Sequence, residues 1–164
     1  MRYFKAAIKW GVYLGLARII STQILTWLGL GTSNWYLVTT YALVALFIFL
    51  LIKNIKEQVE GRFPFMNGLI PIIVAILVSM YLFQLYMFIY VNYIDPQWVQ
   101  NTSDSWIQTM VDSGVDQTVI DNRINYFKKS YQPLSMFTIQ ILNYGVPQMI
   151  LGLIVSLFFV FKRK

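Results

Sequence analysis

The chain has 164 residues, enough for one domain; 57% of them are hydrophobic and only 12% are charged. This composition predicts a membrane protein, because a water-soluble protein of this size could not bury so much apolar surface. The sequence contains no cysteine and no histidine, which excludes disulfide scaffolds, zinc sites of the usual kind and histidine-based acid–base catalysis. The net charge of +6 comes from basic residues at the ends of apolar runs, a placement that indicates membrane orientation rather than nucleic-acid binding.

Four apolar segments have a length suited to a transmembrane helix, which takes about 17–25 residues or more when tilted. We expect these spans at about residues 6–30, 35–52, 65–93 and 134–161. Arg18 interrupts the first segment and no small-residue cleavage site follows it, so we interpret it as a retained helix and not as a signal peptide. The predicted fold is therefore all-α, a single membrane domain over residues 1–164 built as an integral membrane four-helix bundle.

The distribution of lysine and arginine predicts how the spans are oriented. In a four-span arrangement one side carries nine basic residues: Arg2, Lys5, Lys9, Lys53, Lys56, Arg62, Lys162, Arg163 and Lys164. The other side carries only Arg123, Lys128 and Lys129, together with five aspartates. Basic residues favour the cytoplasmic side, so we expect a multi-pass protein of the cytoplasmic (inner) membrane with both termini in the cytoplasm.

The segment between the third and fourth spans, residues 95–132, is predicted to be an outward-facing helical hairpin. Asp95 followed by Pro96 is typical of a helix start, Gly114 of a helix end, and Asp116 of a second start. Apolar residues recur at helical spacing in both arms, which makes each arm amphipathic. The candidate surface residues of the hairpin are Trp98, Trp106, Met110, Ile124 and Phe127.

Three interpretations of the apolar hairpin faces remain open at this stage. The arms can pack on each other and on the ends of the spans, as amphipathic helices generally do. They can instead lie in the outer lipid interface, which the tryptophans would suit. They can also form a docking surface for a partner protein.

Arg18 is the only charge well inside an expected span. It lies nine residues, or ~13 Å, beyond Lys9, and an arginine at that depth costs at least ~2.5–3.5 kcal/mol on insertion scales. Its helical face contains Gly11, Gly15 and Thr22, the first two forming a G-x-x-x-G pair typical of close helix packing. We therefore expect this face to point at other helices.

The fourth span offers Arg18 a polar face with Gln140, Gln148 and Gly152 at multiples of four residues. Other possible partners are Gln84, Asn143, a tyrosine hydroxyl and backbone carbonyls freed by Pro147. One interpretation is that Arg18 is a packing residue whose guanidinium is satisfied internally or reaches the cytoplasmic headgroups. The other is that Arg18, with Gln140 and Gln148, contacts an anion: a lipid phosphate, a substrate carboxylate or a buried acid of a partner.

The carboxylates lie only in polar segments, so the sequence predicts no catalytic residues, no metal site and no cofactor. Proton-coupled transport usually needs an acid or histidine within the membrane, and the expected spans contain neither. We therefore expect a non-enzymatic membrane subunit or scaffold that engages lipid or a partner protein. The alternative is a small transporter, or a channel component assembled from several copies, that uses the Arg18 face.

Several short motifs resemble those of a bacterial family of uncharacterised membrane proteins, domain-of-unknown-function family 4199. The resemblance rests on Lys9-Trp10-Gly11-Val12-Tyr13-Leu14-Gly15-Leu16, on Tyr93-Ile94-Asp95-Pro96, on the helix–Gly114–helix hairpin and on the glycine-bearing last span with its basic tail. The stretch from Gly61 to Gly68 departs from the family pattern because it lacks a glutamate that members often carry there. The resemblance implies a four-helix protein of the cytoplasmic membrane and implies no activity.

Overall fold

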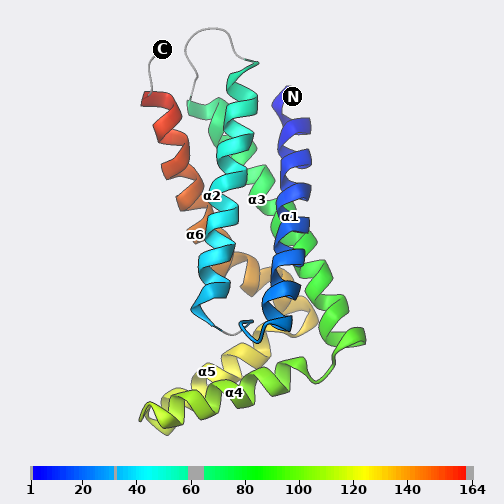
Figure 1. Ribbon diagram of the computed structural model, residues 1–164, viewed down its shortest axis with the longest axis vertical. Helices are drawn as coiled ribbons and strands as arrows, with labels where there is room; N and C mark the ends of the chain where they lie inside the picture. The colour runs from blue at the N-terminus through cyan, green and yellow to red at the C-terminus, as the bar shows by residue number, and fades with distance from the viewer. Residues whose placement is uncertain (1, 32, 59–64, 162–164) are drawn as a thin grey trace. The chain divides into compact units, whose positions relative to one another are not determined.

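The computed structural model describes residues 2–31, 33–58 and 65–161, and this part of the chain is helical without a strand. The elements are α1 (Arg2–Trp27), α2 (Asn34–Lys56), α3 (Phe65–Ile89), the π-helical turn η1 (Tyr90–Ile94), α4 (Trp98–Asp112), α5 (Gln117–Ser130) and α6 (Pro133–Phe161) (Figure 1). The predicted all-α class is confirmed. Arg62 and the basic residues 162–164, which contributed to the predicted orientation, lie outside the described residues.

Three stretches of the described chain are long and apolar enough to cross a membrane: Asn34–Lys56, Gly68–Ile94 and Pro133–Leu157. These helices make the chain a membrane protein. Helix α1 is also long, at 26 residues, but it carries Arg2, Lys5, Lys9 and Arg18 and is less apolar. The fourth span therefore stays a prediction.

The chain divides into two compact units, and the division passes through α3 and α6. We call residues 1–83 and 143–164 the bundle unit, and residues 84–142 the hairpin unit. Each unit is described by itself.

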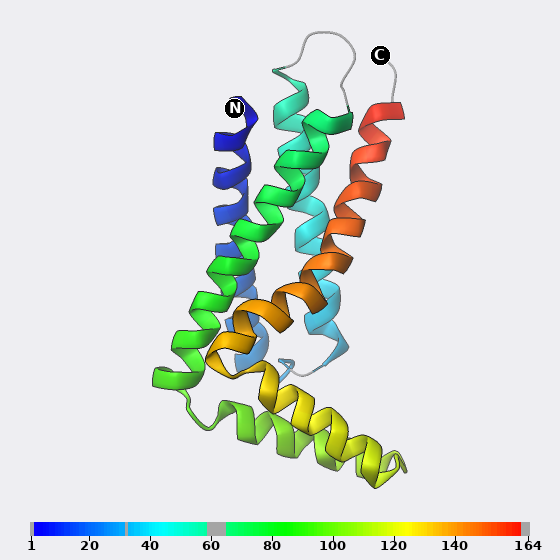
Figure 2. The same ribbon diagram turned by 180° about the vertical axis from the view of Figure 1, so that it is seen from behind.

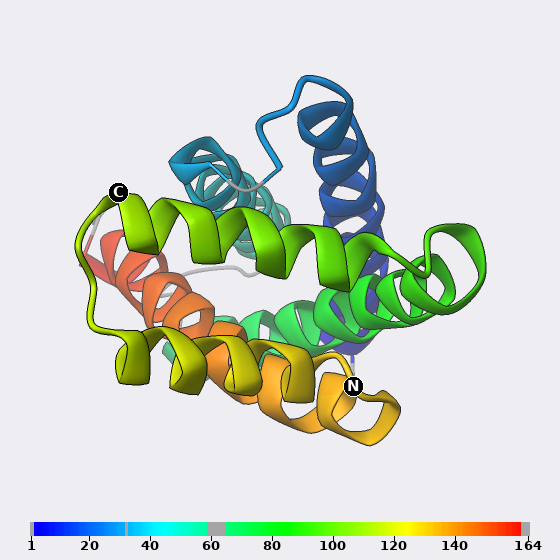
Figure 3. The same cartoon turned by 90° about the horizontal axis from the view of Figure 1, so that it is seen from below.

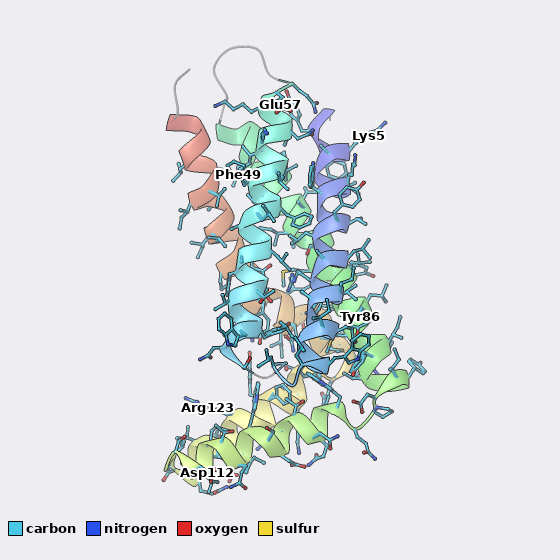
Figure 4. The ribbon with its side chains drawn as sticks, viewed as in Figure 1. Lys5, Phe49, Glu57, Tyr86, Asp112 and Arg123 are labelled. Atoms are coloured by element: carbon cyan, nitrogen blue, oxygen red, sulfur yellow. The ribbon has the colours of Figure 1, made fainter. Side chains whose placement is uncertain are left out.

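In the bundle unit, α1 and α2 lie side by side and run antiparallel (Figures 1 and 2). The edge of the Trp10 ring meets Phe47 across this pair, with ring centroids 6.1 Å apart. Helix α1 ends at Trp27, and Gly29 just beyond it has a φ of 71°, which is costly for other residues; Leu30 N–H then donates to Leu25 O at 2.8 Å. Figure 4 shows Lys5 and Glu57 at the same end of this unit, as the antiparallel pairing requires.

The core of the bundle unit is aliphatic and fully buried. Its members have no more than 1% of their surface exposed and come from α1, α2 and α3: Leu14, Val44, Ile48, Leu51, Ile52, Ile72, Ile76 and Met80. Outward-facing positions on the same helices are also apolar, for example Leu16, Leu46 and Leu77, each at least 40% exposed. Apolar residues on both faces are typical of helices that contact lipid on their outer side.

In the hairpin unit, α4 and α5 lie side by side and antiparallel (Figure 3). Gly114, with φ of 71°, ends α4, and Val115 N–H donates to Met110 O at 3.0 Å. Asp116 begins α5 by accepting a hydrogen bond from Thr118 N–H at 2.8 Å. The predicted helix end and second helix start are therefore confirmed.

The predicted start of the first hairpin helix at Asp95 is wrong. Helix α3 continues into η1, where Asp95 N–H donates to Tyr90 O at 2.8 Å, so Asp95 closes the preceding helix. Helix α4 begins at Trp98 after a turn, and its first flanking residue, Gln97, makes no side-chain capping bond.

Candidate functional site

Helix α1 approaches α3 closely along its glycine face. A Cβ atom added to Gly11 would lie 2.7 Å from the backbone oxygen of Ala75. A Cβ added to Gly15 would lie 2.8 Å from a methyl group of Leu82 and 3.3 Å from the backbone oxygen of Ser79. The G-x-x-x-G pair is therefore used within the chain, between α1 and α3.

One turn beyond Gly15, this close packing brings Arg18 into the interior of the bundle unit. Only 4% of Arg18 is exposed. Its Cζ lies 4.8 Å from the ring centroid of Phe83, a cation–π geometry. Its Nη1 donates to Oε1 of Gln148, which is 1% exposed, at 3.3 Å. Residues from α1, α3 and α6 thus meet at one guanidinium.

Helix α2 completes this arrangement with two tyrosines. Tyr36 and Tyr41 are near enough to interact electrostatically with Arg18. The Tyr36 hydroxyl also lies near the side chains of Thr22 on α1 and Thr40 on α2. We call Arg18, Tyr36, Tyr41, Phe83 and Gln148 the Arg18 cluster.

The Arg18 cluster carries one positive charge, and the sequence places no carboxylate in any of its four helices. Gln148, Tyr36 and Tyr41 are neutral groups, and Phe83 offers only the negative face of its ring. Burying a charge is costly unless it is paired, and a neutral amide compensates only part of that cost. The Arg18 cluster is therefore electrostatically positive.

The other polar residues predicted on the fourth span lie in different surroundings. Gln140 belongs to the hairpin unit, where its Nε2 donates to Ser130 Oγ at 3.1 Å. Ser130 Oγ in turn donates to Phe127 O at 2.7 Å. Gly152 packs in the bundle unit, where an added Cβ would lie 2.6 Å from Ile72 and 3.0 Å from Ile48. Of the two glutamines, Gln148 is the one that meets Arg18.

The apolar faces of the hairpin meet in an aromatic cluster centred on Phe127, which is 8% exposed. Its ring centroid lies 4.6 Å from Trp106, 4.9 Å from Tyr131 and 6.3 Å from Trp98. Ile124 is buried beside it in sequence, at 6% exposure, and Met110 is half-buried. The two arms therefore bury these faces within the hairpin unit.

Comparison with protein families gives one match. The model of the family described as "Protein of unknown function (DUF4199)" covers residues 9–160. The chain belongs to the DUF4199 family. Neither the search of curated proteins nor the search of solved structures returned a match.

Phe83 was not expected from the sequence of this DUF4199 protein; a tyrosine hydroxyl was among the possible partners of Arg18, but neither Tyr36 nor Tyr41 was singled out. Aromatic residues are frequent along α2 and α3, so composition does not distinguish these three. Spacing carried a weak signal for Phe83, which lies one turn beyond Ser79 as Arg18 lies about one turn beyond Gly15. This spacing indicates a contact between Phe83 and Arg18 only when the packing of α1 on α3 is already known.

Proposed function

We propose that this DUF4199 protein is a non-enzymatic, four-pass protein of the inner membrane that serves as a small subunit or scaffold. It engages lipid or a partner protein through the outward hairpin, and both of its termini lie in the cytoplasm. The observation that carries the proposal is the aromatic cluster of Trp98, Trp106, Phe127 and Tyr131. Because the hairpin unit has its own core, its outer surface is preorganised, and a preorganised surface binds at a smaller entropic cost.

The outer surface of the hairpin is mostly polar and carries charges of both signs, with Val111, Val119 and Tyr126 as exposed apolar or aromatic residues. Three aspartates accept hydrogen bonds from glutamines one turn away: Asp104 from Gln100, Asp112 from Gln108, and Asp121 from Gln117. These bonds hold the carboxylates along the helices. Figure 4 labels Asp112 near the turn between α4 and α5, and Arg123 on α5. Such a surface favours a polar partner or lipid headgroups over the apolar interior of a bilayer.

The orientation can be tested with single cysteines because the native sequence contains none. We would introduce Lys5→Cys, Gln58→Cys and Ser113→Cys separately and label intact cells with a membrane-impermeant maleimide. The four-pass arrangement predicts labelling at position 113 only, with positions 5 and 58 labelled after the membrane is opened. Labelling of Lys5→Cys but not Gln58→Cys in intact cells would mean that α1 does not span the membrane.

Engagement by the hairpin can be tested with a photo-crosslinking residue at Val119 or Tyr126, which are 39% and 50% exposed. Gln58, an exposed residue outside the hairpin unit, is the matched control. We expect a discrete protein or lipid adduct from the hairpin positions and none from position 58. Equal adducts from all three positions, or none from any, would contradict the proposal.

A small transporter or channel component is the second candidate, favoured by one observation: the buried positive charge of Arg18. Intramembrane charges often mark a substrate or ion pathway. Anion flux into liposomes that contain the purified protein tests this candidate. It predicts flux with the wild-type protein and none with Arg18→Gln. Flux equal to that of protein-free liposomes would reject this candidate and leave the scaffold proposal untouched.

A further inference from the structure

The arrangement around Arg18 is rich in hydrogen-bond donors and poor in negative charge. The Gln148 Oε1 atom is occupied by Arg18 Nη1, which leaves the amide Nε2 as a donor. Tyr36 and Tyr41 contribute hydroxyl groups within electrostatic range of the guanidinium. Arg18 itself has five N–H donors, of which the 3.3 Å bond to Gln148 uses one. Hydrogen-bond donors near a cation that has no carboxylate partner are suited to an anion.

Ser79 is a buried polar residue about one turn before Phe83 on α3. Its Oγ is buried without a hydrogen-bond partner, and the residue is 0% exposed. Its backbone oxygen lies 3.3 Å from the Cβ position of Gly15, about one turn before Arg18 on α1. A buried hydroxyl without a partner is uncommon and calls for an explanation such as a bound ion or water.

We infer that the Arg18 cluster binds one small monovalent anion of the halide class, held by the guanidinium and the neighbouring neutral donors. One negative charge balances the one positive charge. The inference does not depend on the function proposed for the hairpin, because every residue that it uses belongs to the bundle unit.

Size and depth favour a small inorganic anion over a lipid headgroup or a partner's acid. Leu14, about one turn before Arg18 on α1, and Met80, about one turn before Phe83 on α3, are fully buried, and Phe83 covers one face of the guanidinium. Arg18 is ~13 Å along α1 from Lys9, too deep for a phosphate that stays at the membrane interface. At 4% exposure, Arg18 is also closed to an acidic side chain from another helix.

The test measures thermal unfolding of the purified full-length protein in mild detergent while chloride replaces gluconate at constant ionic strength. Constant ionic strength removes the general screening of surface charges. At a chloride concentration about 100-fold above Kd, we expect Tm to rise by ~5–10 °C and then level off. Bromide in place of chloride should raise Tm in the same way. Equal Tm values in chloride and gluconate would overturn the inference, as would a response to inorganic phosphate or phosphatidylglycerol but not to chloride.

Two variants locate the effect. Gln148→Glu places a carboxylate beside Arg18 Nη1, which neutralises the guanidinium internally, so we expect a folded protein whose Tm no longer responds to chloride. Arg123→Gln removes an exposed arginine of the hairpin unit and should keep the full response. A full chloride response in Gln148→Glu would place the anion elsewhere and refute the assignment.

A direct measurement on the wild-type protein supplements the variants. The chloride-35 NMR signal should broaden in the presence of the protein, and bromide should reverse the excess linewidth by competition. No excess linewidth over a detergent blank would count against the inference, even if every variant failed to fold.

Discussion

Adding a single methyl group at Gly11 tests the packing of α1 on α3. A Cβ at this position would meet the Ala75 backbone oxygen at 2.7 Å, the Val78 Cβ at 2.9 Å and the Ala75 Cα at 3.0 Å. The nearest of these atoms belongs to the backbone of α3, so the helices must separate by several tenths of an ångström. Overpacking of this kind typically costs about 1–3 kcal/mol, part of it because the rest of the interface then packs less tightly.

Gly15→Ala is the matched control because it lies one turn away on the same face of the same helix. Its added Cβ would meet mainly the far end of the Leu82 side chain, at 2.8 Å, and that side chain can move. Replacing glycine by alanine in a helix changes the intrinsic helix preference equally at both positions, by about 1 kcal/mol in favour of alanine. That contribution cancels when the two variants are compared.

We therefore expect Gly11→Ala to be less stable than Gly15→Ala by about 1–2 kcal/mol, within the usual cost of overpacking. Unfolding titrations in mixed micelles, followed by circular dichroism, give both free energies of unfolding. If Gly15→Ala is as destabilised as Gly11→Ala, or more so, the backbone of α1 does not approach α3 at Ala75. In that case the close packing that brings Arg18 into the interior would be absent.

Three further predictions concern the hairpin unit. Phe127→Ala should destabilise the hairpin unit by about 3–5 kcal/mol. Tyr126→Ala removes a half-exposed ring and should cost far less. Hydrogen exchange across α4 and α5 measures the stability of both variants. Gly114→Ala should cost about 1–2 kcal/mol because φ is 71°, again measured by exchange. Asp116→Ala should speed exchange at the start of α5, whereas Asp116→Asn should preserve protection. Hydrogen bonds from Thr118 lower the pKa of Asp116 below its ordinary 3.8. Protection of the amides at the start of α5 should therefore be full above pH 3.8, and it should be lost as the pH falls through the lower pKa of Asp116 in the folded protein.

Local signals in the sequence predicted the second half of the hairpin but failed at its beginning. Gly114 and Asp116 act through their own backbone and their immediate neighbours, so their residue types are sufficient evidence. Asp95-Pro96 carries an equally good local signal. It failed because α3 does not stop where the apolar run stops: the π-helical turn η1 carries the helix on, and the Asp95 N–H bonds back to Tyr90. How far a helix continues depends on its surroundings as well as on its terminal residues.

The partners of Arg18 illustrate a second limit of sequence analysis. The spacing of Gly11, Gly15 and Arg18 predicts a face turned towards other helices, but nothing in it says which helix lies opposite. Gln140 and Gln148 are equivalent as residues, yet they stand eight positions, or ~12 Å, apart on α6. Gln148 is the one that contacts Arg18. Relative depth of the helices is set by packing between distant parts of the chain, which one sequence does not reveal.

Helix α1, the proposed fourth span, differs from α2, α3 and α6 in what would stabilise it in a bilayer. The other three are long and apolar enough to cross a membrane, whereas α1 carries Arg18, whose insertion would cost at least ~2.5–3.5 kcal/mol. That cost is offset only when α1 docks, since Phe83 and Gln148 then contact the guanidinium. Docking in turn requires the close approach at Gly11, where no side chain separates α1 from α3. The glycine face and the buried charge are therefore coupled: α1 packs through both or through neither. A variant that separates α1 from α3 at Gly11 should therefore also weaken the contacts of Arg18 with Phe83 and Gln148.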